Sequence, residues 1–143
     1  MFKALTAAII ALPFAVALQT AKAEPVGQHM YEAVKSDPAL AAEFTQIMKP
    51  VAAKASWVDS FGTTAPSTLE TVDEQTYSVY WGCKPHDCIT ESYVVMYNPK
   101  TKEIAAGAFL QNNYDGPNLT NSDITWLGKT DFDLARALGK YLY

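Results

Sequence analysis

Arginine, cysteine and long hydrophobic runs are scarce in this chain of 143 residues, and each shortage narrows what the protein can do. Arg136 is the one arginine, and 15 acidic residues outnumber 11 basic ones, for a net charge of −4. That balance argues against nucleic acid as a partner, because nucleic-acid binding depends on Lys and Arg contacts to phosphate. After residue 23 no segment is apolar over the roughly 20 residues that a membrane-spanning helix needs. No phosphate loop, nucleotide fingerprint or catalytic triad occurs, so the sequence indicates neither an enzyme nor a cofactor.

The first 23 residues are typical of a cleaved secretory signal peptide. Lys3 supplies a positive start, Ala4–Leu18 is an apolar run, and Ala21-Lys22-Ala23 matches the small-residue cleavage pattern. An uncleaved anchor is the alternative. We therefore predict a signal peptide over residues 1–23 and one exported domain over residues 24–143, a size that suits a single domain.

Export would make the protein more acidic. Lys3 and Lys22 lie in the predicted signal peptide, whereas all 15 acidic residues follow it, so the net charge would fall from −4 to −6. Such a charge favours a cationic partner, although moderate net charge also simply keeps a domain soluble.

A helix is predicted near the start of the exported domain. Its range is Ser36–Lys49, with its first residue or Asp37 as the cap and apolar residues near one face. Pro50 is predicted to end it. A shorter amphipathic piece, Met30–Lys35, precedes it. His29 lies before that piece and is expected to be exposed.

The middle of the chain predicts an antiparallel meander. Thr, Tyr, Val and Ile are enriched in segments that short turns separate, a pattern of successive hairpins. A polar loop is predicted over Asn112–Asp123, and its Asn-Leu-Thr sequon is taken as a chance match. The predicted strands are Thr68–Val72, Thr76–Trp81, Ile89–Tyr97, Glu103–Leu110 and Ile124–Leu127.

A closing helix is predicted over Phe132–Lys140, capped by Thr130 or Asp131. Its buried residues would be Phe132, Leu134, Leu138 and Leu142, and the three tryptophans are expected in the core. The predicted fold class is thus α+β: an antiparallel sheet of about five strands, with an N-terminal helix and a C-terminal helix packed on it.

The two cysteines and one of the two histidines lie together in "WGCKPHDCIT", Trp81–Thr90. An exported protein is expected to oxidise such a pair to a disulfide. If Cys83 and Cys88 face each other across a hairpin, the ring of six residues contributes only about 2 kcal/mol of stability. Its larger effect would be to hold the tip Lys84-Pro85-His86-Asp87 rigid, because Pro85 also fixes one backbone angle.

Three other interpretations of this loop compete with that of a rigid binding tip. A catalytic dithiol usually has two residues between its cysteines, and this pair has four. A zinc site needs four ligands, and bridged Cys83 and Cys88 would leave only His86 and Asp87 nearby. A plain staple with an incidental histidine fits the residues as well as a presented binding tip does, so these two remain open.

The same pairing predicts which side chains share a face of the sheet. Both predicted faces are apolar, so the sequence does not decide which one meets the helices. One face would carry Tyr77, Val79, Trp81, Val94 and Met96, and the other Tyr80, Ile89, Tyr93 and Val95.

The hexapeptide "CKPHDC", Cys83–Cys88, resembles the signature loop of the Ivy family at every position. Members of that family inhibit vertebrate (C-type) lysozyme and come from Gram-negative bacteria. The resemblance extends over "ETVDEQTYSVYWGC" before the loop, "YVVMYNPKTKEIAAGAF" after it and "ITWLG" near the end, from about Pro38 to the C-terminus.

The resemblance implies a periplasmic inhibitor and no enzyme. In Ivy-like proteins the loop enters the lysozyme cleft, and the histidine, here His86, hydrogen-bonds the two catalytic carboxylates. Lys84 and Asp87 would be tip contacts or loop supports. The bacterium's own lytic transglycosylases would be an alternative target, and an envelope-binding or accessory module with the loop as a staple is the rival function. The family has monomers and dimers, so a homodimer stays open.

Overall fold

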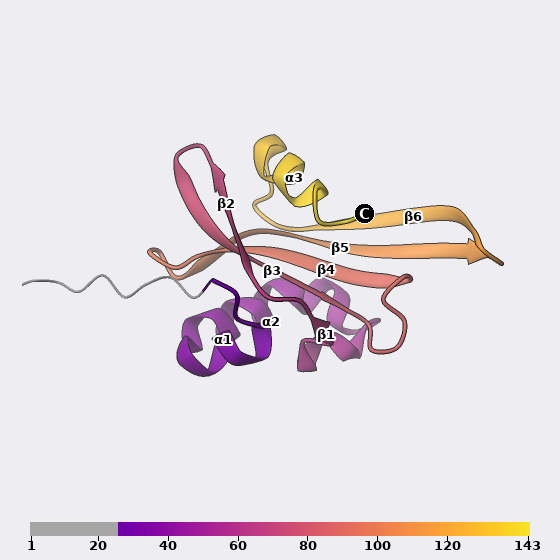
Figure 1. Ribbon diagram of the computed structural model, residues 1–143, viewed down its shortest axis with the longest axis horizontal. Coiled ribbons are helices and arrows are strands. Elements are labelled where there is room, and N and C mark those ends of the chain that lie inside the picture. Colours follow the sequence, from indigo (N-terminus) through magenta and orange to yellow (C-terminus); the bar gives the residue numbers. More distant parts are fainter. Residues whose placement is uncertain (1–25) are drawn as a thin grey trace, which may run out of the picture.

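The computed structural model describes residues 26–143, so the predicted signal peptide and its cleavage site lie outside the described residues. An antiparallel sheet forms the middle layer of the fold. Two helices and a 3-10 helix cover one face of this sheet, and a third helix covers the other (Figure 1). This arrangement confirms the predicted α+β class. None of the helices in the described range has the length and apolar character needed to cross a membrane.

The N-terminal helices are α1, Met30–Ser36, and α2, Pro38–Ala52. The prediction that Pro50 ends the helix is wrong, because α2 continues two residues beyond it. A proline so near the end removes only one amide donor, which would have met the carbonyl of exposed Gln46. Asp37 precedes α2 but makes no side-chain cap bond to it. The chain then forms η1, a 3-10 helix over Ser56–Ser60.

All pairs in the six-stranded sheet are antiparallel, in the order β1-β3-β4-β5-β6, with β2 also paired to β3. The short strand β1 raises the number above the predicted five, and α3, Phe132–Gly139, follows the sheet. The strands are β1 Thr63–Thr64, β2 Thr68–Val72, β3 Gln75–Cys83, β4 Glu91–Asn98, β5 Glu103–Asp115 and β6 Asn118–Gly128.

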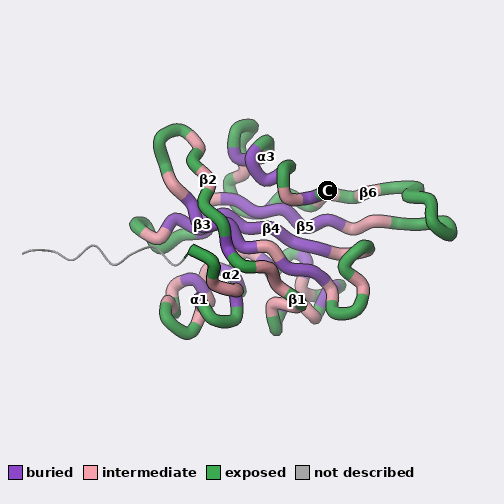
Figure 2. Tube along the Cα trace, in the orientation of Figure 1, coloured by how far each residue is buried: buried purple, intermediate pink, exposed green. Residues whose placement is uncertain are grey.

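The polar loop predicted over Asn112–Asp123 is wrong, because these residues continue β5 and β6 as a hairpin. We call this segment, residues 112–123, the arm. It reaches beyond the other strands, and in Figure 2 the residues at its end are coloured as exposed. Side chains exposed on both faces need no alternation of polar and apolar residues, so the periodicity that predicts a half-buried strand is missing.

Both faces of the sheet are buried, which answers the question that the sequence left open. The first core lies under α1, α2 and η1, and the second lies under α3. The predicted division of strand residues holds: Tyr80, Tyr93 and Val95 belong to the first core, and Tyr77, Val79, Val94 and Met96 belong to the second.

Three apolar side chains that were predicted in the core or on a face of the sheet are not buried. Phe132 is 77% exposed on α3, Trp126 is 45% exposed on β6, and Ile89 is 66% exposed in the loop before β4. Trp57 and Trp81 are half-buried against the two cores. The closing helix is otherwise as predicted: Asp131 accepts a hydrogen bond from the Leu134 amide at 2.9 Å, which caps the helix.

Candidate functional site

The loop between β3 and β4 spans residues 84–90, which is longer than the predicted tip. Cys83 is the last residue of β3 and pairs with Ser92, not with Cys88. The assumption that the cysteines face each other across the hairpin is therefore wrong. The correct partner lies four residues further along, and an even shift leaves the side chains of β3 and β4 on their predicted faces.

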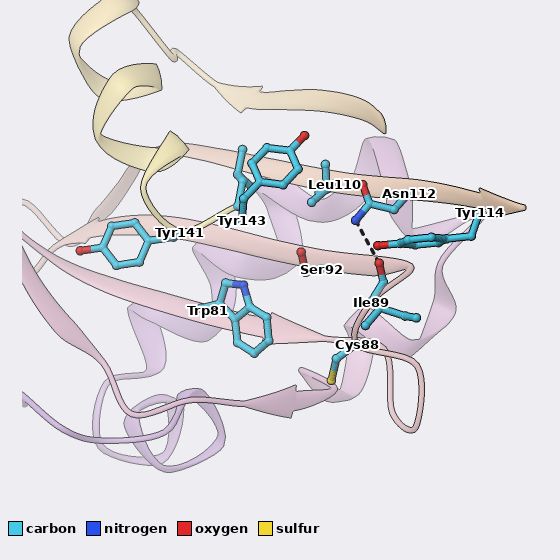
Figure 3. Close-up of a pocket in the computed structure, with 10 residues that line it drawn as sticks. Trp81, Cys88, Ile89, Ser92, Leu110, Asn112, Tyr114, Tyr141 and Tyr143 are labelled. Atoms are coloured by element: carbon cyan, nitrogen blue, oxygen red, sulfur yellow. Dashed lines mark hydrogen bonds between the residues drawn. The ribbon is translucent and has the colours of Figure 1, made fainter. Parts of the chain in front are cut away.

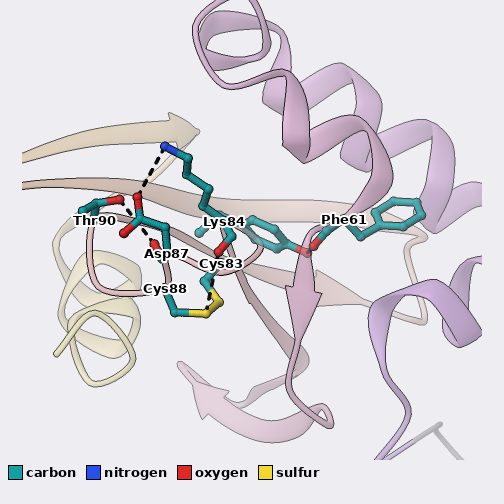
Figure 4. Close-up of a disulfide and its surroundings, with 7 residues drawn as sticks. Phe61, Cys83, Lys84, Asp87, Cys88 and Thr90 are labelled. Atoms are coloured by element: carbon teal, nitrogen blue, oxygen red, sulfur yellow. Dashed lines mark hydrogen bonds and ion pairs between the residues drawn. A yellow bond between two sulfur atoms is a disulfide. The ribbon is translucent and has the colours of Figure 1, made fainter.

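The two cysteines form a disulfide that closes this loop upon itself (Figure 4). Their Cα atoms are 4.8 Å apart, within the range that disulfides prefer. Cys83 is fully buried at the end of β3, whereas Cys88 is exposed. The bridge thus fastens an exposed loop residue to the buried end of a strand.

The tip is a tight turn with His86 near its apex. The Asp87 amide donates to the Lys84 carbonyl at 3.0 Å, so these two residues are the first and last of a four-residue turn. Pro85 occupies the second position and His86 the third, where its φ is 65°. Proline followed by a left-handed residue is typical of a type II turn. Histidine adopts this conformation more readily than most side chains do. Both turn residues are exposed, so the imidazole is presented to solvent.

Lys84 and Asp87, the first and last residues of the turn, also interact through their side chains. The Lys84 ammonium lies 3.5 Å from an Asp87 carboxylate oxygen, with both side chains partly exposed. The Asp87 carbonyl also accepts from the Thr90 amide at 3.2 Å and from the Thr90 hydroxyl at 3.3 Å. An exposed ion pair contributes little stability. Its effect is to favour one conformation of the tip.

Residues from distant parts of the chain hold the base of the loop. The Trp57 indole of η1 donates to a Glu91 carboxylate oxygen at 2.6 Å, and the Glu91 carbonyl accepts from the Lys84 amide at 3.0 Å. From β5, the Asn112 amide donates to the Thr90 carbonyl at 2.7 Å. The Asn112 side chain donates to the Ile89 carbonyl at 2.9 Å (Figure 3). Sequence reasoning missed the supports from Trp57 and Asn112, because they are 22 to 34 residues from their partners along the chain and belong to no motif.

Beneath the loop, the packing around two glycines leaves no room for a side chain. A Cβ atom added to Gly62 would lie 2.2 Å from the Cys83 carbonyl oxygen, and one added to Gly82 would lie 2.6 Å from the Tyr93 ring. The Tyr93 hydroxyl donates to the Phe61 carbonyl at 3.0 Å. Burial raises the pKa of the Tyr93 phenol, which keeps it neutral and able to donate.

The other histidine belongs to the fold and lies away from the loop. His29 immediately precedes α1; its amide donates to a Glu32 carboxylate oxygen at 2.9 Å, and its ring nitrogen lies 3.0 Å from the Thr64 hydroxyl. The prediction that it is simply exposed is wrong, because its side chain is half-buried. Within residues 26–143, no group of three or more His, Cys, Asp or Glu side chains could hold a metal ion.

These features define a class of protein: a small α+β domain with an exposed, disulfide-closed loop between two strands of its sheet. A family model described as "Inhibitor of vertebrate lysozyme (Ivy)" matches residues 39–126, which is more than half of the chain. The chain therefore belongs to the Ivy family. The match begins in α2, ends in β6 and includes the whole loop.

Two curated relatives agree with this assignment. Each is named "Inhibitor of vertebrate lysozyme", one from Escherichia coli strain K12 and the other from Escherichia coli O157:H7. Both are 32% identical to this chain over 76 residues, which is 53% of this chain and 46% of the relative. The chain thus spans about half the length of the curated relatives that it matches. Both are named for inhibition and not for catalysis, which agrees with the prediction of a non-enzyme.

Proposed function

We propose that this protein inhibits vertebrate (C-type) lysozyme by inserting the tip Lys84-Pro85-His86-Asp87 into the active-site cleft of that enzyme. The observation that carries the proposal is the exposed His86, held in a left-handed conformation at the apex of a disulfide-closed turn. Membership of a family named for lysozyme inhibition supports the choice of partner.

The chemistry of the target suits an imidazole. Lysozyme-type glycosidases have two catalytic carboxyl groups about 5 Å apart, one protonated and one ionised. An imidazole has two ring nitrogens on opposite sides and can contact both groups at once. Neighbouring carboxylates also favour a positively charged ring. In this mechanism His86 occupies the acid and base groups while the rest of the tip fills the sugar-binding cleft.

Rigidity lowers the cost of binding. Ordering a flexible side chain at an interface costs roughly 0.5 to 1.5 kcal/mol, and a loop that is already ordered avoids much of that cost. Here the disulfide, the turn hydrogen bond and the Lys84–Asp87 pair fix the tip before the partner arrives. Trp57 and Asn112 fix its base.

The test is a cell-wall clearing assay with purified protein and C-type lysozyme. His86→Asn removes the imidazole, yet asparagine tolerates the left-handed backbone. We expect it to weaken inhibition by about 100-fold, which is the effect of losing a central interface residue. His29→Asn replaces the other histidine and is the matched control, which should inhibit like the wild type. Unchanged clearing in the presence of micromolar wild-type protein would refute the proposal. Equal inhibition by His86→Asn would refute the role of the imidazole alone.

The same assay addresses the cellular role. We propose that the predicted signal peptide exports the protein to the periplasm, where it would meet lysozyme entering from outside and the cell's own lytic transglycosylases. Replacing lysozyme with a purified lytic transglycosylase asks whether the loop also inhibits that enzyme. A purely structural staple would leave both activities unaffected.

A further inference from the structure

The arm is a part of the fold that packs on neither core. Residues 113–121 are all exposed, and in Figure 1 the strands β5 and β6 run past the end of the sheet as a two-stranded ribbon. Such a ribbon is at best marginally stable in water. Polar side-chain bonds hold it together instead of a core: the Thr120 hydroxyl donates to the Asn113 carbonyl at 2.9 Å, and the Ser122 hydroxyl donates to the Asn112 side chain at 2.7 Å.

The arm and the loop between β3 and β4 form one continuous surface. The two Asn112 hydrogen bonds to the Ile89 and Thr90 carbonyls join the base of the arm to the loop, immediately after Cys88. In Figure 3 Tyr114 on the arm extends towards Ile89. These two side chains line a groove of about 260 Å³, which Trp81 and Leu110 also line. A partner that receives the tip would therefore face the arm as well.

Exposed apolar side chains gather on this surface. Ile89 is 66% exposed, Tyr114 is 39% exposed and Leu119 is 49% exposed. Tyr114 and Leu119 are direct partners across the arm, so their side chains share one face. Large apolar side chains that gather on the surface of a soluble protein usually mark a contact with another molecule.

The charge of the arm indicates the kind of partner. From Glu103 to Gly128 the chain has three acidic residues and no lysine or arginine. Asp115 lies at the arm tip and Asp123 near its base, and both are exposed. This acidic surface suits a cationic protein and repels an acidic one.

The size of a specific interface also requires more than the tip. Stable interfaces bury about 800 Å² on each partner and involve about 20 to 30 residues a side. The tip of residues 84–87 is far smaller than that. We propose that the surface formed by Ile89, Tyr114, Leu119 and Asp115 binds a positively charged surface of the same lysozyme outside its cleft, while the tip occupies the cleft. This inference rests on the proposed function.

The experiment measures inhibition constants and association rates for C-type lysozyme with variants of the arm. Tyr114→Ala and Leu119→Ala should each raise the inhibition constant about tenfold, as loss of a partly buried interface anchor does. Asp115→Lys should slow association several-fold at low salt and much less at 0.5 M salt, because steering by charge is screened. Excess inhibitor should still block the enzyme fully, because the tip is intact.

Matched controls lie on other parts of the surface. Phe132→Ala removes a 77% exposed aromatic side chain from α3, and Leu69→Ala removes a 43% exposed leucine from β2. Glu74→Lys reverses an exposed charge in the turn between β2 and β3, far from the arm in Figure 1. All three should inhibit within twofold of the wild type.

The outcomes separate the two proposals. If the arm variants match the wild type while His86→Asn loses inhibition, the arm inference is wrong and the proposed function stands. If the arm variants and the surface controls weaken inhibition equally, the arm inference is also wrong. If wild-type protein does not inhibit lysozyme, both proposals fall. Weakening confined to the arm variants, with unchanged thermal unfolding of each protein, supports the inference.

Discussion

His86 shows how one residue can depend on its neighbours for its conformation. A left-handed backbone is costly for most side chains, and in this turn Pro85 and the hydrogen bond from the Asp87 amide to the Lys84 carbonyl impose it. Strain of this kind persists where the surrounding structure fixes it, which is common at binding and active sites. The sequence places the histidine in the loop, but only the turn shows that it stands at the apex.

Gly62 is the residue beneath the loop whose replacement should destabilise the protein most. Its φ of 64° disfavours any side chain, and an added Cβ would meet the Cys83 carbonyl oxygen and the Trp57 ring. We expect Gly62→Ala to lower the free energy of unfolding by at least about 2 kcal/mol. Urea unfolding followed by fluorescence measures this change.

Gly116 provides the control for this substitution. Its φ is 56°, so alanine has a similar backbone cost there, but nothing lies within 4 Å of an added Cβ. Gly116→Ala should cost only about 1 kcal/mol. Equal losses at the two positions would mean that the close approach beneath Cys83 has no energetic weight.

At the scale of elements, the loop and the arm differ in how they are held. A covalent bridge closes the loop, and its base is fixed by hydrogen bonds from η1 and β5. The arm has only its own strand pairing and polar side-chain bonds. The loop is therefore fixed by more long-range contacts than the arm is.

Removal of the bridge should affect inhibition more than stability. We expect the double variant Cys83→Ala/Cys88→Ala to lose about 2 kcal/mol of unfolding free energy, because the ring is short. Its inhibition of lysozyme should weaken by more than the roughly 30-fold that this energy represents, because the tip is no longer ordered. Unfolding curves and inhibition constants measured on the same samples decide the comparison. Full inhibition by a strongly destabilised variant would show that the bridge serves the fold.

The helices and strands were largely predictable from the sequence, and the supports of the site were not. Periodic apolar residues predicted α2 and α3, and turn residues separated the strands. Cys83 and Cys88 stood out because only four residues separate them in the sequence and the chain has no other cysteines. Trp57 and Asn112 belong to no sequence motif. Their contacts with the loop form only when folding brings distant segments of the chain together.

For the whole molecule, Asp37 links three elements of the fold. At the start of α2, its carboxylate accepts hydrogen bonds from Tyr97 of β4 at 2.8 Å and from Lys102, just before β5, at 2.7 Å. Burial raises the pKa of this carboxyl, but the hydrogen bonds from Lys102 and Tyr97 and the charge of Lys102 outweigh burial. Its pKa in the folded protein is therefore below the usual value of 3.8.

This lowered pKa predicts how stability depends on acidity. A carboxyl group whose pKa falls on folding stabilises the protein above its unfolded pKa, and this contribution is lost as the pH drops through the folded pKa. We expect Asp37→Asn to cost about 1 kcal/mol at pH 7 and much less near pH 2. Urea unfolding at both pH values measures the difference. A cost that does not change with pH would contradict the proposed ionic contribution.

The two-sided core also determines how the loop responds to force. Within β4, Ser92–Asn98 are all buried, so the strand that continues from the loop lies between both cores. We expect the backbone amides of this strand to exchange with deuterium only when the whole protein unfolds. We therefore expect a pull on the tip to act directly on the part of the molecule that opens last, which gives a small loop a firm mechanical anchor.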